Sequence, residues 1–400
     1  MRTVGIICEY NPFHAGHAHQ LEAARRATEA SLAVAVMSEH VTQRGELAIA
    51  DGYVRAEAAV RAGVDLLIGL PFPYSSAPAE FFALAGVRIL DALGVDALHF
   101  GSECGDIDEL KSCTERLYAS EFIEKLTQYQ QAHPSLGVME CRDKLYRETY
   151  GMPIPNGSND LLGMAYLHAL AVASSPMRPY TVKREGQAFG DAAVPSQGTH
   201  PSATALRALW RDASLSALRP HLPDAVWSTL SRAVDERLAP VDEHALSSAL
   251  VTFYRTANAT SLSACYGLEG GLADRLCHAA REATDLASLL RLAATRRYTD
   301  ARIRRSVWYG LCGVTEHDVT APPAYVRLLA ANARGCAYLA DIRKHCALPL
   351  LTKPADLPST PEAARQAAIE QRLEDVLTLA YPTPQPSGSL VRRRPYIDKS

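Results

Sequence analysis

Residues 3–17 read TVGIICEYNPFHAGH. The aliphatic run at 3–8 predicts a buried strand, and residues 17–29 have the spacing of a helix. His14 and His17 are three residues apart, so they share one face of that helix at its first turn. Free backbone N–H groups and the positive end of the helix dipole make this position favourable for a phosphate. We therefore expect a nucleotide site here, with His14 and His17 as the catalytic pair.

Two other interpretations of the H-x-G-H motif stay open. The histidines could be surface or helix-capping residues, or they could bind zinc. The strand before the motif and the helix after it favour the nucleotide site, and Gly16 leaves room for a close approach to the backbone. A zinc site would need a third and a fourth ligand at useful spacing, which the sequence does not offer nearby.

The first half of the chain alternates short apolar runs with helical patterns. This rhythm predicts an α/β fold, a Rossmann-like parallel sheet with helices on both faces. The expected strands are 3–8, 32–37, 65–70, 97–101 and 180–184, and the expected helices between the first four are 17–29, 52–62 and 77–93. In such sheets ligands bind beyond the carboxyl ends of the strands, so the polar segments that follow the strands should converge on one crevice.

Beyond about Ser202 the strand signal fades and Ala-, Leu- and Arg-rich helical segments predominate. We expect a nucleotidyltransferase-like domain at 1–205 and a mainly helical domain at 206–381. A final helix should begin near Thr360, where a capping threonine precedes a proline. Residues 382–400 are rich in Pro, Ser and Gly, and we expect a mobile tail.

Composition narrows the class of protein. The 400 residues are 48% hydrophobic and 21% charged, with a net charge of −3, so any nucleic-acid site must be a local patch. Nine cysteines are scattered without a C-x-x-C pair, which argues against a disulfide framework or a zinc ribbon. No signal peptide or membrane span is indicated. These features predict a cytosolic (cytoplasmic) protein, and they do not indicate its oligomeric state.

A series of motifs resembles the bacterial tRNA(Met) cytidine acetate ligase family, within the H-x-G-H nucleotidyltransferase superfamily. The motifs run in order along nearly the whole chain: GIICEYNPFHAGH at 5–17, MSEHVTQRGELAIAD at 37–51, RAEAAVRAGVDLLIGLP at 55–71, AEFFALAGVRILDALGVDALHFGSE at 79–103, NDLLGMAYLHAL at 159–170, VKR at 182–184, SATALR at 202–207, RRYTDARIRR at 296–305 and LPLLTK at 348–353. Glu39, His40 and Thr42 depart from the family pattern, which has a more Gly/Asn/Phe-like loop, and Gly52 stands where a lysine is expected.

The resemblance implies a two-step reaction. Acetate attacks the α-phosphate of ATP to give acetyl-adenylate and pyrophosphate, and the wobble cytidine of elongator tRNA(Met) then takes the acetyl group as N4-acetylcytidine. Mg²⁺ is expected to accompany ATP, although no protein metal-ligand cluster is indicated by the sequence. Catalysis would consist of positioning and of stabilising charge on phosphate oxygens, the role assigned to His14 and His17.

The resemblance also implies which residues contact the nucleotide. The expected ATP-binding residues are Ile7, Cys8, Glu9, Tyr10, Asn11, Pro12, Phe13, His14, Ala15, Gly16, His17, Ala18, His19, Gln20, Gly101, Asn159 and Arg184. For the last three the sequence leaves alternatives: a turn glycine at 101, a helix N-cap at Asn159 and an exposed arginine at 184. A second phosphate motif, Ser202-x-Thr204-x-x-Arg207, could equally be an ordinary helix start.

A basic segment lies far from the ATP motif in the sequence. Residues 291–305 contain six arginines and one acidic residue, Asp300. Such a patch suits an RNA backbone, and we expect Arg296, Arg297 and Arg304 to bind tRNA. The alternative is a solvated helix face.

Two rival functions use the same residues. One is an adenylyltransferase that acts on a phosphorylated metabolite, although such enzymes are usually shorter. The other is a tRNA-binding protein without catalysis, against which the phosphate-site residues argue.

Overall fold

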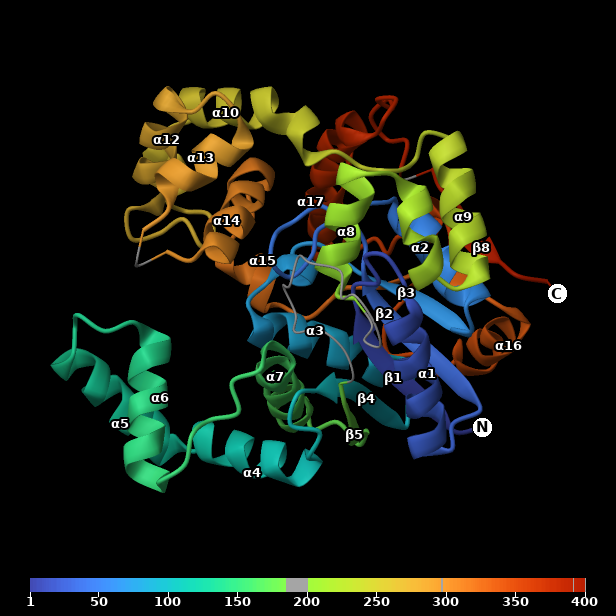
Figure 1. Cartoon of the computed structure of the whole chain (residues 1–400), viewed down its shortest axis with the longest axis horizontal. Helices are drawn as coiled ribbons and strands as arrows, with labels where there is room; N and C mark the ends of the chain where they lie inside the picture. The colour runs from blue at the N-terminus through green and yellow to red at the C-terminus, as the bar shows by residue number, and fades with distance from the viewer. Residues whose placement is uncertain (185–200, 296–297, 391, 400) are drawn as a thin grey trace.

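The computed structural model describes residues 1–184, 201–295, 298–390 and 392–399. One mixed sheet forms its centre, with strand order β5-β4-β1-β2-β3-β6-β7 and β8 paired with β6 (Figure 1). The strands are β1 (Thr3–Cys8), β2 (Leu32–Ser38), β3 (Leu66–Leu70), β4 (Ala97–Ser102), β5 (Arg178–Lys183), β6 (Val326–Ala331), β7 (Leu350–Leu351) and β8 (Tyr396–Ile397). The first five strands pair in parallel, as the sequence predicted, and β6 runs antiparallel to β3.

Helices cover both faces of the sheet and build the second half of the chain. The α-helices are α1 (Ala15–Thr28), α2 (Gly52–Arg61), α3 (Ala79–Ala92), α4 (Ile107–Leu117), α5 (Ser120–Ala132), α6 (Val138–Tyr150), α7 (Ser158–Val172), α8 (Ala203–Asp212), α9 (Asp224–Asp235), α10 (Ser247–Thr256), α11 (Ala259–Leu262), α12 (Leu272–Glu282), α13 (Leu286–Ala293), α14 (Asp300–Cys312), α15 (Glu316–Thr320), α16 (Ala333–Ile342) and α17 (Pro361–Leu377). Short 3₁₀ turns are η1 (Tyr74–Ser76), η2 (Leu215–His221), η3 (Glu243–Leu246), η4 (Pro354–Asp356) and η5 (Thr378–Ala380).

Alternation along the strands separates two buried cores. In β1, Ile7 faces the core formed with α3, α7 and α16, whereas Val4 and Ile6 face the core formed with α1, α2, α8 and α9. This period of two is what a strand buried on both faces requires. The arrangement places the carboxyl ends of β1, β4 and β5 beside the start of α1.

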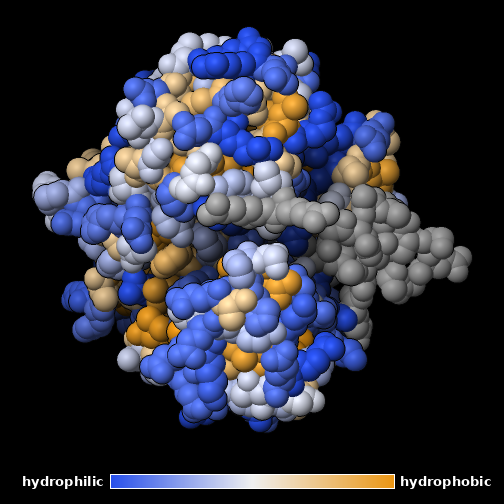
Figure 2. All heavy atoms as spheres, turned by 90° about the vertical axis from the view of Figure 1, so that its left-hand side faces the viewer, coloured by the Kyte–Doolittle hydropathy of each residue, from blue (hydrophilic) through white to orange (hydrophobic). Residues whose placement is uncertain are grey.

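Two groups of helices project from the sheet on the same side of the molecule. Helices α5 and α6 form a hairpin at the lower left of Figure 1, and α10 to α14 form a separate group above it. Figure 2 looks onto this side and shows two largely hydrophilic lobes with scattered apolar patches. The exposed apolar residues of the lower lobe include Ile123, Val138 and Met139.

Besides the short β7, two segments of the second half form strands that the sequence did not predict. Val326–Ala331 joins the sheet as β6, although its Leu and Ala residues suit a helix as well as a strand. Tyr396 and Ile397 pair with Ala330 and Ala331, so this part of the expected mobile tail is a strand of the sheet. β6 covers the sheet edge that β3 would otherwise leave unpaired, and β8 in turn pairs with β6.

The boundary between the two proposed domains stays a prediction. None of the helices in the described part of the chain combines the length and apolar character that crossing a bilayer requires.

Candidate active site

The H-x-G-H motif forms the junction between β1 and α1. His14 is the N-cap of α1, and its Nδ1 accepts a hydrogen bond from the backbone N–H of Gly16 at 3.1 Å. The backbone N–H of His14 donates in turn to Nδ1 of His17 at 3.3 Å. The two rings lie 3.9 Å apart between centroids. Both histidines therefore cap the N-terminus of α1 through Nδ1, as the helix-capping interpretation of the motif expected. Because Nδ1 accepts in both rings, each neutral imidazole carries its proton on Nε2, as a donor to a phosphate requires.

The pKa of His17 is lowered well below its usual value. Burial is the main cause, and the nearby His14 and Arg184 charges act in the same direction. Tyr10 and Phe13 pack against the His17 ring, with centroids at 5.0 and 5.6 Å. His17 is thus a neutral hydrogen-bond donor near pH 7, where the sequence left both charge states open.

The loop between β1 and α1 is held from behind by buried side chains. Tyr10 and Phe13 are each 1% exposed and belong to the core on the α1 face of the sheet. Arg55 donates to the backbone carbonyl of Glu9 at 2.5 Å, and Ile49 N–H donates to Oδ1 of Asn11 at 2.8 Å. These residues support the shape of the loop, and their contacts with ATP stay a prediction.

Gly101, Asn159 and Arg184 come from three elements and meet at the carboxyl ends of β4 and β5. The guanidinium of Arg184 donates to Oδ1 of Asn159 at 3.0 Å. A Cβ atom on Gly101 would lie 3.0 Å from Cγ of Arg184, so the glycine leaves room for the arginine side chain. The Arg184 charge also contributes to the low pKa of His17, which links this group to the H-x-G-H motif.

Glu103 holds Asn159 in place at the carboxyl ends of β4 and β5, and the sequence did not indicate this role. Its carboxylate accepts from the backbone N–H groups of Asn159 and Asp160, at 3.1 and 2.8 Å, and from Nδ2 of Asn159 at 2.8 Å. Burial would raise the pKa of Glu103, but these hydrogen bonds lower it. The N-cap residue of α7 is Gly157, so Asn159 is not the helix cap that the sequence allowed. The only local signal was the position of Glu103 directly after β4.

The Ser202-x-Thr204-x-x-Arg207 segment begins α8 and supports the nucleotide loop. Oγ of Ser202 accepts from the N–H of Ala205 at 3.0 Å, as in an ordinary helix cap. Arg207 is buried and donates to the carbonyl of Asn11 at 3.1 Å and to Glu46 at 2.9 Å. In this arrangement Arg207 positions the loop after β1 through its backbone.

A second loop, residues 39–51, connects this site to α14. Gln43 N–H donates to Glu9 at 2.9 Å, while the carbonyl of Gly45 accepts from Nε1 of Trp308 at 2.8 Å. The same loop contains the departures from the family pattern. Thr42 accepts from the N–H of Glu46 within it. A Cβ atom at Gly52 would lie only 2.7 Å from the carbonyl oxygen of Glu39, which explains a glycine at this position.

Two arginines of the basic segment, Arg302 and Arg304, form ion pairs with acidic side chains. Arg304 lies 2.8 Å from Glu243, and Arg302 lies 3.1 Å from Glu269. Arg296 and Arg297 lie outside the described residues. The prediction that Arg304 binds tRNA therefore concerns a side chain that already has an ionic partner.

Comparisons with known proteins are consistent along the whole chain. The model of the HIGH Nucleotidyl Transferase family matches residues 1–389. A tRNA(Met) cytidine acetate ligase of Syntrophotalea carbinolica is 37% identical over 361 residues, covering 88% of this chain and 85% of that protein. The protein of that name from Levilactobacillus brevis is 32% identical and covers 99% of both chains.

Two solved structures of Thermotoga maritima TmcAL are similar over 100% of both chains at 28% identity. The apo form has a TM-score of 0.92, and the form bound to alpha-thio ATP has a TM-score of 0.90.

Proposed function

Because the chain belongs to the HIGH Nucleotidyl Transferase family and, within it, to the tRNA(Met) cytidine acetate ligases, we propose that it activates acetate with ATP and acetylates a cytidine of tRNA(Met). It is an ATP-dependent ligase. The observation that carries the proposal is the His14–His17 pair at the N-terminus of α1, with a neutral His17, beside Arg184 and Asn159. An ATP analogue bound to the similar Thermotoga maritima protein supports a nucleotide at this fold.

The first step is a displacement at the α-phosphate of ATP. A carboxylate oxygen of acetate forms the new bond to phosphorus, and the bond to the departing pyrophosphate breaks. Negative charge spreads over the phosphate oxygens in the transition state. The Nε2–H of His17, the Arg184 guanidinium and the first N–H groups of α1 are the donors suited to that charge. Because these groups are already fixed by Nδ1 capping and by Asn159, little reorganisation is needed during the reaction.

In the second step the exocyclic amine of the cytidine attacks the acetyl carbonyl. The bond to AMP breaks, AMP leaves as the anion and the amine loses one proton. The wobble position of elongator tRNA(Met) and the N4 atom belong to this proposal as implied by the family. No nucleophile of the protein takes part in either step.

Mg²⁺ would enter with the phosphates of ATP. The carboxylates at this corner, Glu103 and Asp160, already accept hydrogen bonds from backbone N–H groups. They therefore suit a Mg²⁺ ion whose ligands are mostly phosphate oxygens and water molecules, as is usual for Mg²⁺ in proteins. The chemistry that Mg²⁺ supplies when bound is neutralisation of phosphate charge.

The test is a pair of assays on the purified protein. Exchange of pyrophosphate into ATP should require acetate and proceed without coenzyme A, and mass spectrometry should find N4-acetylcytidine in tRNA(Met) after incubation with ATP and acetate. Exchange that ignores acetate and responds to a phosphorylated metabolite would identify the rival adenylyltransferase. Binding of tRNA with no exchange at all would identify the non-catalytic rival.

The basic segment at residues 291–305 is the proposed tRNA-binding surface, and Arg296 and Arg297 are its proposed contacts with tRNA. Arg304 belongs to this proposal only if its ion pair with Glu243 opens on binding. A cytosolic location is also part of the proposal, because ATP and tRNA are both available there.

A further inference from the structure

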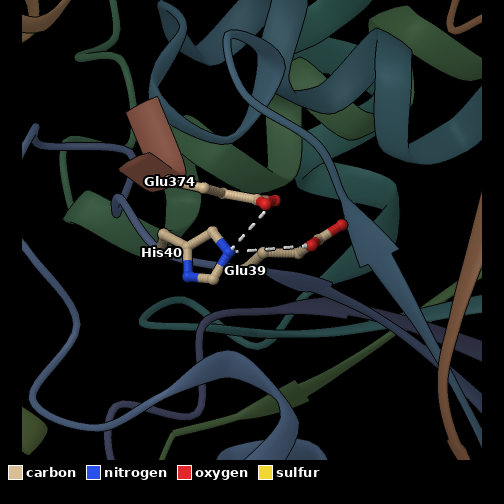
Figure 3. A group of neighbouring side chains, drawn as sticks. All are labelled: Glu39, His40 and Glu374. Atoms are coloured by element: carbon tan, nitrogen blue, oxygen red, sulfur yellow. Dashed lines mark ion pairs between the residues drawn. The ribbon is translucent and has the colours of Figure 1, made fainter. Parts of the chain in front are cut away.

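A buried group of side chains lies away from the H-x-G-H site, between the second loop and α17. It consists of Glu39, His40 and Glu374, drawn in Figure 3. One donor atom from each side chain lies within 4.8 Å of the other two. Glu39 and His40 directly follow β2, whereas Glu374 comes from the last long helix. Two of the three residues, Glu39 and His40, are among the departures from the family pattern noted in the sequence.

Each of the three side chains has one polar atom without a hydrogen-bond partner in the described part of the chain. Oε1 of Glu39, Nε2 of His40 and Oε2 of Glu374 are buried and have no hydrogen-bond partner there. Their side chains are 4%, 9% and 3% exposed. A buried polar atom without a partner costs about 1–3 kcal/mol, and more when it is charged. Nε2 of His40 is the unpartnered atom that faces the two carboxylates (Figure 3), and a group bound there would satisfy it.

The distances fit a bound cation better than direct hydrogen bonds. Nε2 of His40 lies 3.6 Å from Glu374 and 4.0 Å from Glu39, beyond hydrogen-bonding range. Two ligands of a tetrahedral zinc ion, each about 2.0–2.1 Å from the metal, are separated by about 3.4 Å. The distance from His40 to Glu374 exceeds this separation by about 0.2 Å and the distance from His40 to Glu39 by about 0.6 Å, so binding requires the three side chains to move closer together.

Space and charge support the same conclusion. A cavity of about 10 Å³ is lined by Glu39, His40, Phe72, Glu370, Leu373 and Glu374, which is near the size of a single water or ion. Three carboxylates, those of Glu39, Glu370 and Glu374, surround one guanidinium, that of Arg327. A divalent cation would supply the missing positive charge, which a water molecule cannot do.

Neighbouring groups hold the two glutamates in place. Arg327 donates to Oε2 of Glu39 at 3.2 Å and to Oε1 of Glu374 at 2.8 Å, and these are the same two oxygens whose distances to Nε2 of His40 are given above. Each would bind the ion while it accepts from Arg327. A Cβ atom on Gly69 would lie 1.9 Å from Oε1 of Glu39, so only glycine admits this carboxylate. Such supporting contacts orient ligands at metal sites.

We propose that Glu39, His40 and Glu374 form a binding site for a first-row divalent metal ion, with Zn²⁺ as the ion that the donor set suits. One imidazole and two carboxylates are ligands that zinc accepts, and the fourth position would be filled by water. The ion would connect the loop after β2 to α17 and so stabilise the contact between the two halves of the chain. The site is structural and separate from the ATP chemistry.

The first experiment measures metal content and stability on untagged protein. Elemental analysis after Zn²⁺ loading and desalting should find about one ion per chain, and Co²⁺ in its place should give a visible absorption band. A chelator should lower the melting temperature of the wild type. A wild type that retains no metal and melts identically with chelator would overturn the proposal, and would leave protonation of His40 as the means of balancing the cluster.

Variants locate the site. His40→Asn is expected to fold, because a residue of this kind is what the family loop carries, and it should weaken Zn²⁺ binding by at least about tenfold. Glu374→Gln should do the same while keeping the shape of the side chain. His278→Asn is the matched control, since His278 is an exposed histidine on α12. Metal retained by both His40→Asn and Glu374→Gln would show that the ion binds elsewhere.

Discussion

Two arginines on α14, Arg302 and Arg304, look equivalent in the sequence, but the structure predicts that replacing them has different effects on stability. Arg304 and Arg302 each form an ion pair with a glutamate, at 2.8 and 3.1 Å. The side chains of the first pair, Arg304 and Glu243, are 28% and 15% exposed, whereas those of the second, Arg302 and Glu269, are 36% and 59% exposed. The first pair also touches the second loop: Glu243 accepts from the N–H of Leu47 at 3.5 Å.

Arg304→Ala should therefore destabilise the protein more than Arg302→Ala. An exposed ion pair contributes about 0–1 kcal/mol, and removal of one partner from a buried pair costs about 3–5 kcal/mol. With Glu243 mostly buried and Arg304 partly so, we expect Arg304→Ala to lower the free energy of unfolding by about 2 kcal/mol. Arg302→Ala should lower it by less than about 1 kcal/mol.

Arg304→Ala should also weaken ATP binding. Glu243 contacts the second loop, in which the backbone N–H of Gln43 donates to Glu9 at 2.9 Å. If this loop becomes less ordered, the KM for ATP should rise a few-fold and kcat should change less. The assay combines urea denaturation of both variants with pyrophosphate exchange at varied ATP concentration. Equal loss of stability in the two variants would refute the reasoning. So would an Arg304→Ala protein of normal stability that only binds tRNA less well, because Arg304 would then be an unpaired cation.

Three further predictions concern the candidate active site, the basic segment and a buried histidine of β4. His17→Ala should fold normally and lower acetate-dependent exchange by about 100-fold or more, because a preformed donor to the α-phosphate is lost; an unchanged rate would place the site elsewhere. Arg296→Ala with Arg297→Ala should weaken tRNA binding and flatten its salt dependence in a filter-binding titration, while exchange stays normal; unchanged binding would favour a solvated helix face. His99 is buried in β4, where both ring nitrogens lack partners among the described residues, and burial lowers its pKa to about 4. Because the unfolded state binds the proton more tightly, stability should be lost as pH falls from 6.5 towards 4, by up to about 3 kcal/mol. His99→Leu should remove that slope in denaturation curves, and an unchanged slope would show that His99 does not cause it.

Local patterns in the sequence were sufficient for the nucleotide half. The strand at 3–8, the two histidines and Gly16 lie within one strand–loop–helix, so spacing alone places them at a helix N-terminus. β2, β3 and β4 were also predicted, because a strand buried on both faces is a continuous apolar run whatever its neighbours are. β5 was predicted as well, although it is a partly exposed strand at the edge of the sheet. Family resemblance added Gly101, Asn159 and Arg184, and the structure shows that these three residues meet.

Contacts between distant segments were decided only by the tertiary structure. Val326–Ala331 has a composition that suits helix and strand alike, and the open edge of β3 makes it a strand. Glu103 looks like any polar residue after a strand until α7 places two backbone N–H groups on its carboxylate. Glu39 and His40 looked like departures from a family loop, and only the packing of α17 brings Glu374 to them. Charge neutralisation and hydrogen bonding depend on separation in space, which sequence spacing determines within one element and not between elements.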